Sequence, residues 1–157
     1  MSSKNSSKRS VYRVRNDMAV TAIGTSSGSN IMYTADEDVT LVRVRGHFTA
    51  YDATTVTGQF LFEWLLSIWP RGQSVAADPT TTLNTAQDAV PDEELLRQRG
   101  VISKQTNGAG HMTYEWEFDS KAMRKLRKDD EIRLSRICNS ASSVGFVGTI
   151  YLWFKEA

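Results

Sequence analysis

The run VTLVRVRGHFTAY, residues 39–51, decides the fold class of this chain. In an extended strand, successive side chains point to opposite faces, so alternate residues share a face. One face of this run is apolar and consists of Val42, Val44, Phe48 and Ala50, with Gly46 in the same row. The other face is polar and consists of Arg43, Arg45, His47 and Thr49. The alternation predicts a half-buried strand whose outer face is partly cationic.

Seven further β-rich runs follow or precede this one, separated by clusters of Gly, Ser, Asn and Asp. The runs are residues 18–24, 31–34, 57–69, 100–104, 111–119, 131–138 and 144–155. Two short stretches, 92–96 and 121–128, have patterns that favour a helix or a helical turn. The connection from 70 to 96 is the one long connection, and connections of that length usually carry contacts or function.

These elements predict an all-β fold. Several turn signals, without an alternation of strands and helices, are typical of an antiparallel sandwich or barrel. The runs 39–51, 57–69 and 144–155 exceed the average strand of about five or six residues, which favours two coupled sheets. We therefore expect an eight-stranded antiparallel jelly-roll sandwich, formed by one domain because the chain has only 157 residues.

The net charge of +1 hides an uneven distribution. Residues 1–15 hold five serines and no acidic residue and carry +5, which leaves −4 for the other 142 residues. Such a segment has too little apolar area to offset its ordering entropy, so we expect a flexible basic arm over 1–15 and a folded domain over 16–157. Flexible basic arms bind phosphates by releasing counterions. The candidate nucleic-acid contacts are Lys4, Lys8, Arg9, Arg13 and Arg15 in the arm, with Arg43 and Arg45 on the strand.

No residue pattern predicts catalysis or a cofactor. His47 and His111 are the two histidines, and neither has a second ligand at metal-site spacing. Cys138 is the single cysteine, and no histidine lies near it in the sequence to activate the thiol. We expect no enzymatic activity, no metal and no cofactor. The longest apolar run, residues 60–69, is too short for a membrane helix, and no secretory signal is visible.

Two charged groups have more than one interpretation. Glu115, Glu117 and Asp119 would share one strand face, which is compatible with paired catalytic carboxylates, although a solvated face is the simpler interpretation. The basic cluster within residues 121–128 is followed at once by three acidic residues. Ion pairs within this turn or with a neighbouring subunit therefore compete with phosphate binding as its role.

The segment Ser7-Lys8-Arg9-Ser10, the strand 39–51 and the segment 119–126 together carry a family likeness. The chain resembles the single jelly-roll capsid proteins of small circular single-stranded DNA viruses, and satellite virus coat proteins are similar in size and layout. The resemblance implies a virion protein that assembles inside the host cell into a small icosahedral shell of about 60 copies. It also implies arms that point inward and bind viral nucleic acid, expected to be single-stranded DNA, with no membrane partner.

Exposed apolar residues would then form the subunit contacts, and the candidates are Val75, Val90 and Val101. Two alternatives remain open. One is a trimeric jelly-roll receptor-binding or ligand module that does not bind nucleic acid. The other is a carbohydrate-binding or hydrolytic sandwich whose stacking platform is Trp64, Trp69, Trp116 or Trp153; for Trp116, the alternation with Tyr114 and Phe118 favours a core position instead.

Overall fold

The computed structural model of the chain describes residues 11–23, 28–52, 58–72, 94–104, 113–138 and 144–156. These residues contain no helix, and hence no helix that could span a membrane. They form the strands β1 (Val11–Ile23), β2 (Gly28–Thr34), β3 (Val39–Asp52), β4 (Gly58–Trp69), β5 (Glu94–Lys104), β6 (Thr113–Leu126), β7 (Glu131–Cys138) and β8 (Val144–Glu156).

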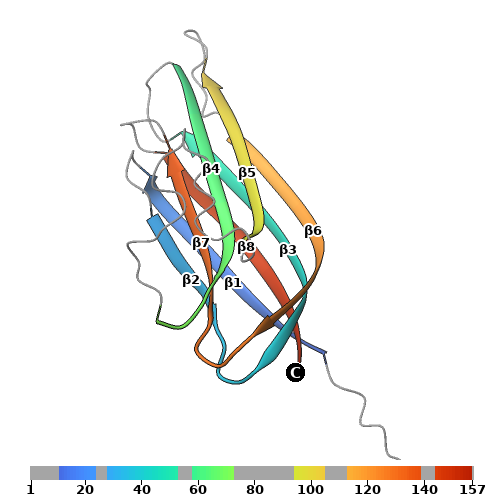
Figure 1. Cartoon of the computed structure of the whole chain (residues 1–157). Helices are drawn as coiled ribbons and strands as arrows, with labels where there is room; N and C mark the ends of the chain where they lie inside the picture. The colour runs from blue at the N-terminus through green and yellow to red at the C-terminus, as the bar shows by residue number, and fades with distance from the viewer. Residues whose placement is uncertain are drawn as a thin grey trace, which may run out of the picture.

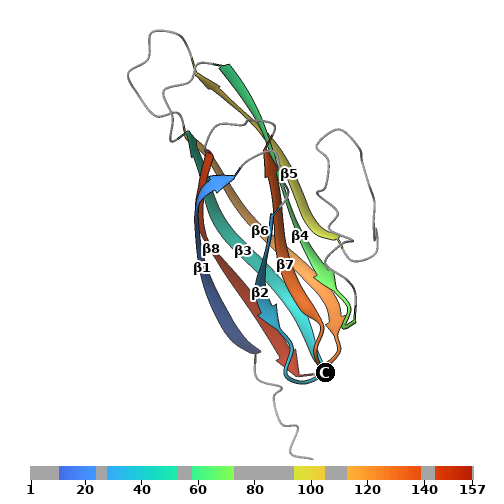
Figure 2. The same cartoon turned by 90° about the vertical axis from the view of Figure 1, so that its left-hand side faces the viewer.

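The eight strands form two four-stranded antiparallel sheets that face each other (Figures 1 and 2). The first sheet has the order β1-β8-β3-β6 and the second the order β2-β7-β4-β5. Only β4 and β5 are neighbours both in the chain and in a sheet, and every other connection crosses between the sheets. This arrangement is a jelly roll, and the predicted eight-stranded antiparallel sandwich is confirmed.

The two sheets are joined by a cluster of aromatic side chains. Trp64 of β4 is fully buried, and its ring lies 5.3 Å from that of Phe48 and 5.2 Å from that of Phe118. Phe48 also stacks on Phe146 at 5.0 Å. A tryptophan of the second sheet therefore packs against two phenylalanines of the first, and the third, Phe146, packs behind Phe48. Large rings at these separations supply both apolar burial and favourable ring geometry.

Two glycines of the first sheet allow these rings to lie flat against a neighbouring strand. Gly148 faces Phe48 across the β8–β3 pair, and a Cβ on Gly148 would lie 2.2 Å from the Phe48 ring and 2.4 Å from the backbone oxygen of His47. Gly46 faces Phe118 across the β3–β6 pair, and a Cβ there would lie 2.5 Å from that ring. Only a residue without a side chain fits at either position.

The two segments expected to be helical are strands where the structure describes them. Residues 121–126 continue β6, because two residues of β6, Ala122 and Met123, lie opposite the single residue Val42 of β3. Residues 94–96 begin β5, where Leu95 is the extra residue between two pairs with β4. A β-bulge interrupts the period-2 pattern while preserving the strand, so both predictions were wrong for the same reason.

β3 has a bulge of its own, because Val42 is an extra residue between its pairs with β8, and this bulge corrects the predicted inner face of β3. Leu41 is fully buried, whereas Val42, expected to face the core, is only half-buried. From residue 43 onward the predicted alternation is confirmed, with Val44 and Phe48 buried and Arg43 exposed.

The first strand begins before residue 15, where the sequence predicted the boundary between the flexible arm and the folded domain. β1 begins at Val11 and pairs with β8 from its first residue, Val11 opposite Lys155. Arg13 and Arg15 therefore lie on a paired strand rather than in a flexible arm. Lys4, Lys8 and Arg9 lie outside the described residues.

Asp130 ties together three connections at one end of the sandwich. Its buried carboxylate accepts hydrogen bonds from the amides of Arg71, at 3.1 Å, and Arg127, at 2.8 Å. Its backbone oxygen accepts from the amide of Ala35 at 2.9 Å, and the Ala35 oxygen accepts from the amide of Asp129 at 2.7 Å. Asp129 has a φ of 72°, a left-handed conformation that aspartate tolerates in tight turns.

We predict that Gly148→Ala destabilises the protein by about 1–3 kcal/mol, because the added methyl group forces β8 away from the Phe48 ring and the β3 backbone. Denaturant unfolding measures the loss. The neighbouring variant Val147→Ala is the control, since Val147 is 42% exposed and its truncation opens no cavity. Equal stability of the two variants would contradict the packing described for this strand pair.

Candidate nucleic-acid interface

The outer face of the first sheet has a charge gradient along its strands. Strand register places its residues in rows that run across β1, β8, β3 and β6. From the end where β1 begins, the rows are Val11–Lys155–Thr40–Lys125, Arg13–Trp153–Arg43–Lys121, Arg15–Tyr151–Arg45–Asp119, Asp17–Thr149–His47–Glu117 and Ala19–Val147–Thr49–Glu115. The first three rows hold seven Lys or Arg residues and one carboxylate, and we call them the cationic half. The last two rows, the acidic half, hold three carboxylates and no Lys or Arg.

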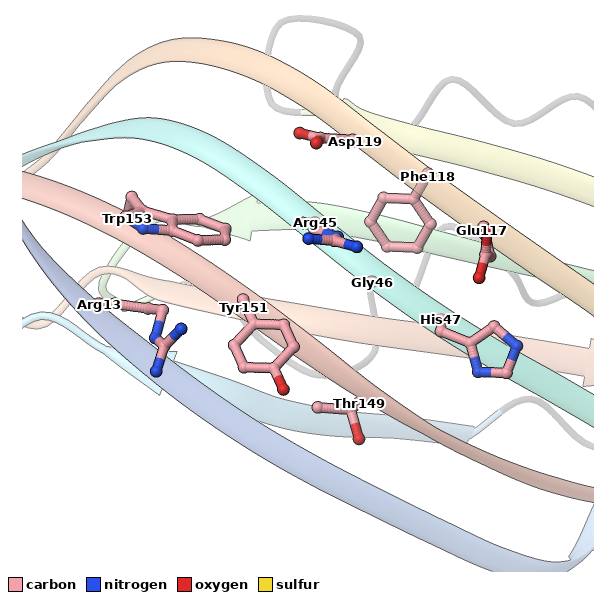
Figure 3. A pocket seen from close by; sticks show the side chains of 10 residues that line it. All are labelled: Arg13, Arg45, Gly46, His47, Glu117, Phe118, Asp119, Thr149, Tyr151 and Trp153. Atoms are coloured by element: carbon pink, nitrogen blue, oxygen red, sulfur yellow. The ribbon is translucent and has the colours of Figure 1, made fainter.

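Two aromatic side chains lie among the arginines of the cationic half (Figure 3). Both belong to the central strand β8, and the rings of Tyr151 and Trp153 are 6.1 Å apart. The guanidinium of Arg43 lies 4.9 Å from the centre of the Trp153 ring. Those of Arg13 and Arg15 lie 5.2 Å and 5.9 Å from the centre of the Tyr151 ring. Each contact is a cation–π interaction, which holds the guanidinium near the sheet surface.

Arg43 is further fixed by Asp119 of β6. Its Nε donates to Oδ1 of Asp119 at 2.8 Å and its Nη2 to Oδ2 at 2.5 Å, a two-pronged pairing across the β3–β6 pair. The hydrogen bonds from Arg43 hold the pKa of Asp119 below its usual value. The charge of Arg43 is therefore largely compensated where it lies over Trp153.

Arg15 is compensated in a similar way by Asp17. Its Nε donates to Oδ1 of Asp17 at 3.2 Å, and the hydroxyl of Thr149 donates to the same oxygen at 2.6 Å. The Thr149 hydrogen bond, more than Arg15, lowers the pKa of Asp17. This contact marks the border between the cationic and acidic halves.

Arg13 and Arg45 have no carboxylate within ion-pair distance in the described part of the chain. They lie on the two strands that flank β8, on either side of Tyr151 (Figure 3). Both line a surface pocket of about 690 Å³ that also includes Tyr151, Trp153 and His47. An anion that enters this pocket meets two guanidinium groups that are not held in an ion pair, although Asp119 lies opposite Arg45 and interacts with it electrostatically.

Two described cations of the second sheet, Arg97 and Arg133, are paired with carboxylates of the same sheet. Arg97 of β5 donates to Glu63 at 2.7 Å and to Glu94 at 3.1 Å. Burial lowers the pKa of Arg97, but the two carboxylates outweigh it and leave the pKa raised. Arg133 of β7 donates to Glu131 at 2.6 Å and lies 4.6 Å from the centre of the Trp69 ring. These side chains stabilise the second sheet and offer no free positive charge.

The sequence-based candidates divide into two groups. Arg13, Arg15, Arg43 and Arg45, named separately as arm and strand residues, lie together in rows two and three of one face. Residues 1–10 are not described, but the chain enters the sheet at Val11, in the first row of the cationic half. Their position relative to the face stays a prediction.

Sequence reasoning did not include Tyr151, Trp153 and Lys155 among the nucleic-acid contacts, and named Trp153 only as one candidate for a sugar-stacking platform. The signal was available, because residues 144–155 alternate and these three share a parity with Thr149. Phe154, Leu152 and Ile150 on the other parity are fully buried, so the residues of β8 with odd numbers must face outward.

The other candidate residues do not form a second site in the described chain. Glu115 and Glu117 are exposed, and Asp119 is paired with Arg43, so the three carboxylates form a solvated face. No group of three or more His, Cys, Asp and Glu among the described residues lies close enough together to hold a metal ion. His111, Val75 and Val90 lie outside the described residues, and the side chains of Val101 and Cys138 are likewise not described.

The four tryptophans differ in solvent exposure, which decides whether each could stack on a sugar. Trp64, Trp69 and Trp116 are 0%, 4% and 6% exposed, so none offers a free ring face for a sugar. The core position expected for Trp116 is confirmed. Trp153 is half-buried on the outer face of the first sheet and is the tryptophan that a ligand reaches.

Comparison with known proteins shows no close relative. No protein-family model matches the chain, and no curated protein sequence matches it. The chain is similar to a solved structure of Bacillus endospore appendages, with 10% identity, coverage of 100% of this chain and 98% of that chain, and a TM-score of 0.36. It is also similar to a structure of Desmodium yellow mottle tymovirus, with 10% identity, coverage of 94% and 88%, and a TM-score of 0.38.

A third similar structure is the VP2 subviral particle of infectious bursal disease virus. Identity is 10%, the match covers 96% of this chain and 33% of that chain, and the TM-score is 0.39. Scores this low carry no inference about function. The jelly roll is established by the strand order of the two sheets instead.

We predict that the Arg43–Asp119 pair stabilises the protein in a pH-dependent way. The folded-state pKa of Asp119 is lowered, so the contribution is present above the ordinary value of 3.8 and is lost as the pH falls through the folded-state pKa. Thermal unfolding from pH 7 to pH 2 should show Asp119→Asn less stable than wild type at neutral pH, with the difference shrinking below pH 3.8. Glu117→Gln is the control on the same strand, and a constant Asp119→Asn deficit at every pH would contradict the assignment.

Proposed function

We propose that this chain is a viral capsid protein that assembles with its own copies into a small icosahedral shell and packages nucleic acid. The observation that carries the proposal is the cationic half of the first sheet, in which Arg13 and Arg45 form no ion pair with a described carboxylate. Lys4, Lys8 and Arg9 precede Val11 in the sequence, and Val11 lies in the first row of the cationic half. By its resemblance to capsid proteins of small circular single-stranded DNA viruses, the packaged polymer is single-stranded DNA, and the protein is a virion component assembled in the host cell.

The charge distribution suits a function that depends on many copies. A single subunit offers a few free cations, which bind a polyanion weakly at physiological salt. A shell that turns the same face of every subunit inward multiplies these contacts, so the avidity for one long polymer far exceeds the affinity of one site. On the second sheet, the described cations Arg97 and Arg133 are already paired with carboxylates.

Self-association is supported by an asymmetry between the two lateral sides of the sandwich. Where β1 and β2 meet, side chains close the gap between the sheets. The hydroxyls of Tyr12 and Tyr33 are hydrogen-bonded at 3.2 Å, and the amide of Asn16 donates to the backbone oxygen of Met32 at 3.0 Å.

On the other side, where β5 and β6 meet, apolar surface remains accessible. A pocket of about 110 Å³ is lined by the partly exposed apolar residues Leu95, Leu96 and Ala122, and at its margin by the charged residues Glu94, Lys121 and Arg124. Met123 beside it is 64% exposed. Exposed apolar side chains on an unpaired edge strand favour contact with another subunit.

We predict that the purified chain forms closed particles visible by negative-stain electron microscopy, and that Met123→Glu reduces their yield while leaving the subunit folded by circular dichroism. Val147→Glu is the matched control, because it introduces the same charge at an exposed valine of the sheet face. A monomer at every concentration and salt condition, or a discrete trimer, would contradict the shell and favour the receptor-binding alternative.

We also predict that the double variant Arg13→Glu/Arg45→Glu binds a single-stranded oligonucleotide at least about tenfold more weakly than wild type, with a shallower dependence of log Kd on log salt. Fluorescence anisotropy measures both quantities. Arg71→Glu/Lys128→Glu makes the same change in net charge at exposed connections that are not part of the sheet face. Equal weakening by both pairs would assign binding to net charge rather than to the cationic half.

A further inference from the structure

We infer that Tyr151 and Trp153 are a stacking platform for unpaired bases, so that the cationic half selects single-stranded nucleic acid over polyanions without bases and over duplexes. The inference rests on the proposed function for the binding of nucleic acid and adds the chemistry by which the polymer is recognised. Two observations support it: the position of the two rings on the central strand, and the difference between Arg43, which is ion-paired, and Arg13 and Arg45, which are not.

The two rings occupy the middle of the binding surface. β8 lies between β1 and β3, so cations on both neighbouring strands border the aromatic pair. The ring centres of Tyr151 and Trp153 are 6.1 Å apart along the strand, and Figure 3 shows both on the pocket side of the sheet. Aromatic side chains on a central strand of a four-stranded sheet are a known solution for stacking exposed bases.

The arginines divide into two functional groups. Arg43 is locked against Trp153 and its charge is compensated by Asp119, so it extends the flat surface around the ring. A planar guanidinium is itself a surface on which a base stacks. Arg13 and Arg45 form no ion pair with a described carboxylate and lie on opposite sides of Tyr151, where they suit the phosphates of a strand whose bases lie over β8.

A nucleic-acid duplex does not present its bases to these aromatic rings. Its bases are stacked on one another inside the helix, and it offers a sheet surface mainly phosphates and sugars. Stacking on aromatic side chains requires bases that are free on at least one face, and it is tolerant of sequence because every base has a π-face. The platform therefore predicts preference for single strands without base specificity.

The experiment compares three fluorescent probes of equal length by anisotropy: an oligothymidylate, an abasic single strand and a duplex. Wild type is expected to bind oligothymidylate at least about tenfold more tightly than the abasic strand, because each stacked base contributes to affinity. Trp153→Leu and Tyr151→Leu should each reduce this ratio while leaving abasic-strand affinity nearly unchanged. Val147→Ala, on the same strand and face in the acidic half, should retain the full ratio.

A second readout follows tryptophan fluorescence. Trp153 is the half-buried tryptophan and the other three are buried, so oligothymidylate should quench a component of the emission that is absent in Trp153→Leu. Equal wild-type affinity for oligothymidylate and the abasic strand, or a preference that survives both substitutions, would overturn the platform while leaving phosphate binding and the capsid proposal intact. Absence of binding to all three probes would overturn the nucleic-acid role itself.

Discussion

The position of β8 between β1 and β3 is the constraint on which both the core and the binding surface depend. Because side chains alternate along a strand, the register that buries Ile150, Leu152 and Phe154 also places Tyr151 and Trp153 outside. A slip of one residue would exchange the two sets and bury polar groups in the core. The same pairing brings the arginines of β1 and β3 to either side of the aromatic pair. The surface chemistry of this sheet is therefore a direct consequence of how its core is packed.

The two sheets use their charged residues differently. On the second sheet, Arg97 and Arg133 pair with carboxylates and contribute to the structure of the sheet itself. On the first sheet, Arg15 and Arg43 form ion pairs with Asp17 and Asp119, whereas Arg13 and Arg45 form no ion pair with a described carboxylate. A surface cation without an ion pair lowers the stability of the folded protein when it is repelled by neighbouring cations. The same cation is available to bind an anion. This contrast is what distinguishes a binding surface from an ordinary charged face.

Much of the fold followed from the sequence, because period-2 patterns and turn signals located eight β-rich runs, each of which overlaps one of the eight strands. The two wrong helix predictions both lie at β-bulges. The extra residue of β6 at Ala122–Met123 and the extra residue Leu95 of β5 each interrupt the period-2 alternation, so the sequence pattern favoured a helix there. The start of β1 was missed because five serines and five cations in residues 1–15 outweighed the short alternation from Val11. The site was found only in part, since Arg13 and Arg45 are 32 residues apart in the chain and only strand order brings them onto one face.

Photochemical cross-linking of the full chain to a single-stranded oligonucleotide, followed by mass spectrometry of the peptides, locates the bound polymer most directly. The account predicts adducts on the outward residues of β8, above all Tyr151 and Trp153, together with contacts on β1 near Arg13. Adducts confined to the β2-β7-β4-β5 sheet, or to residues 1–10 alone, would contradict the claim that the face of the first sheet binds nucleic acid.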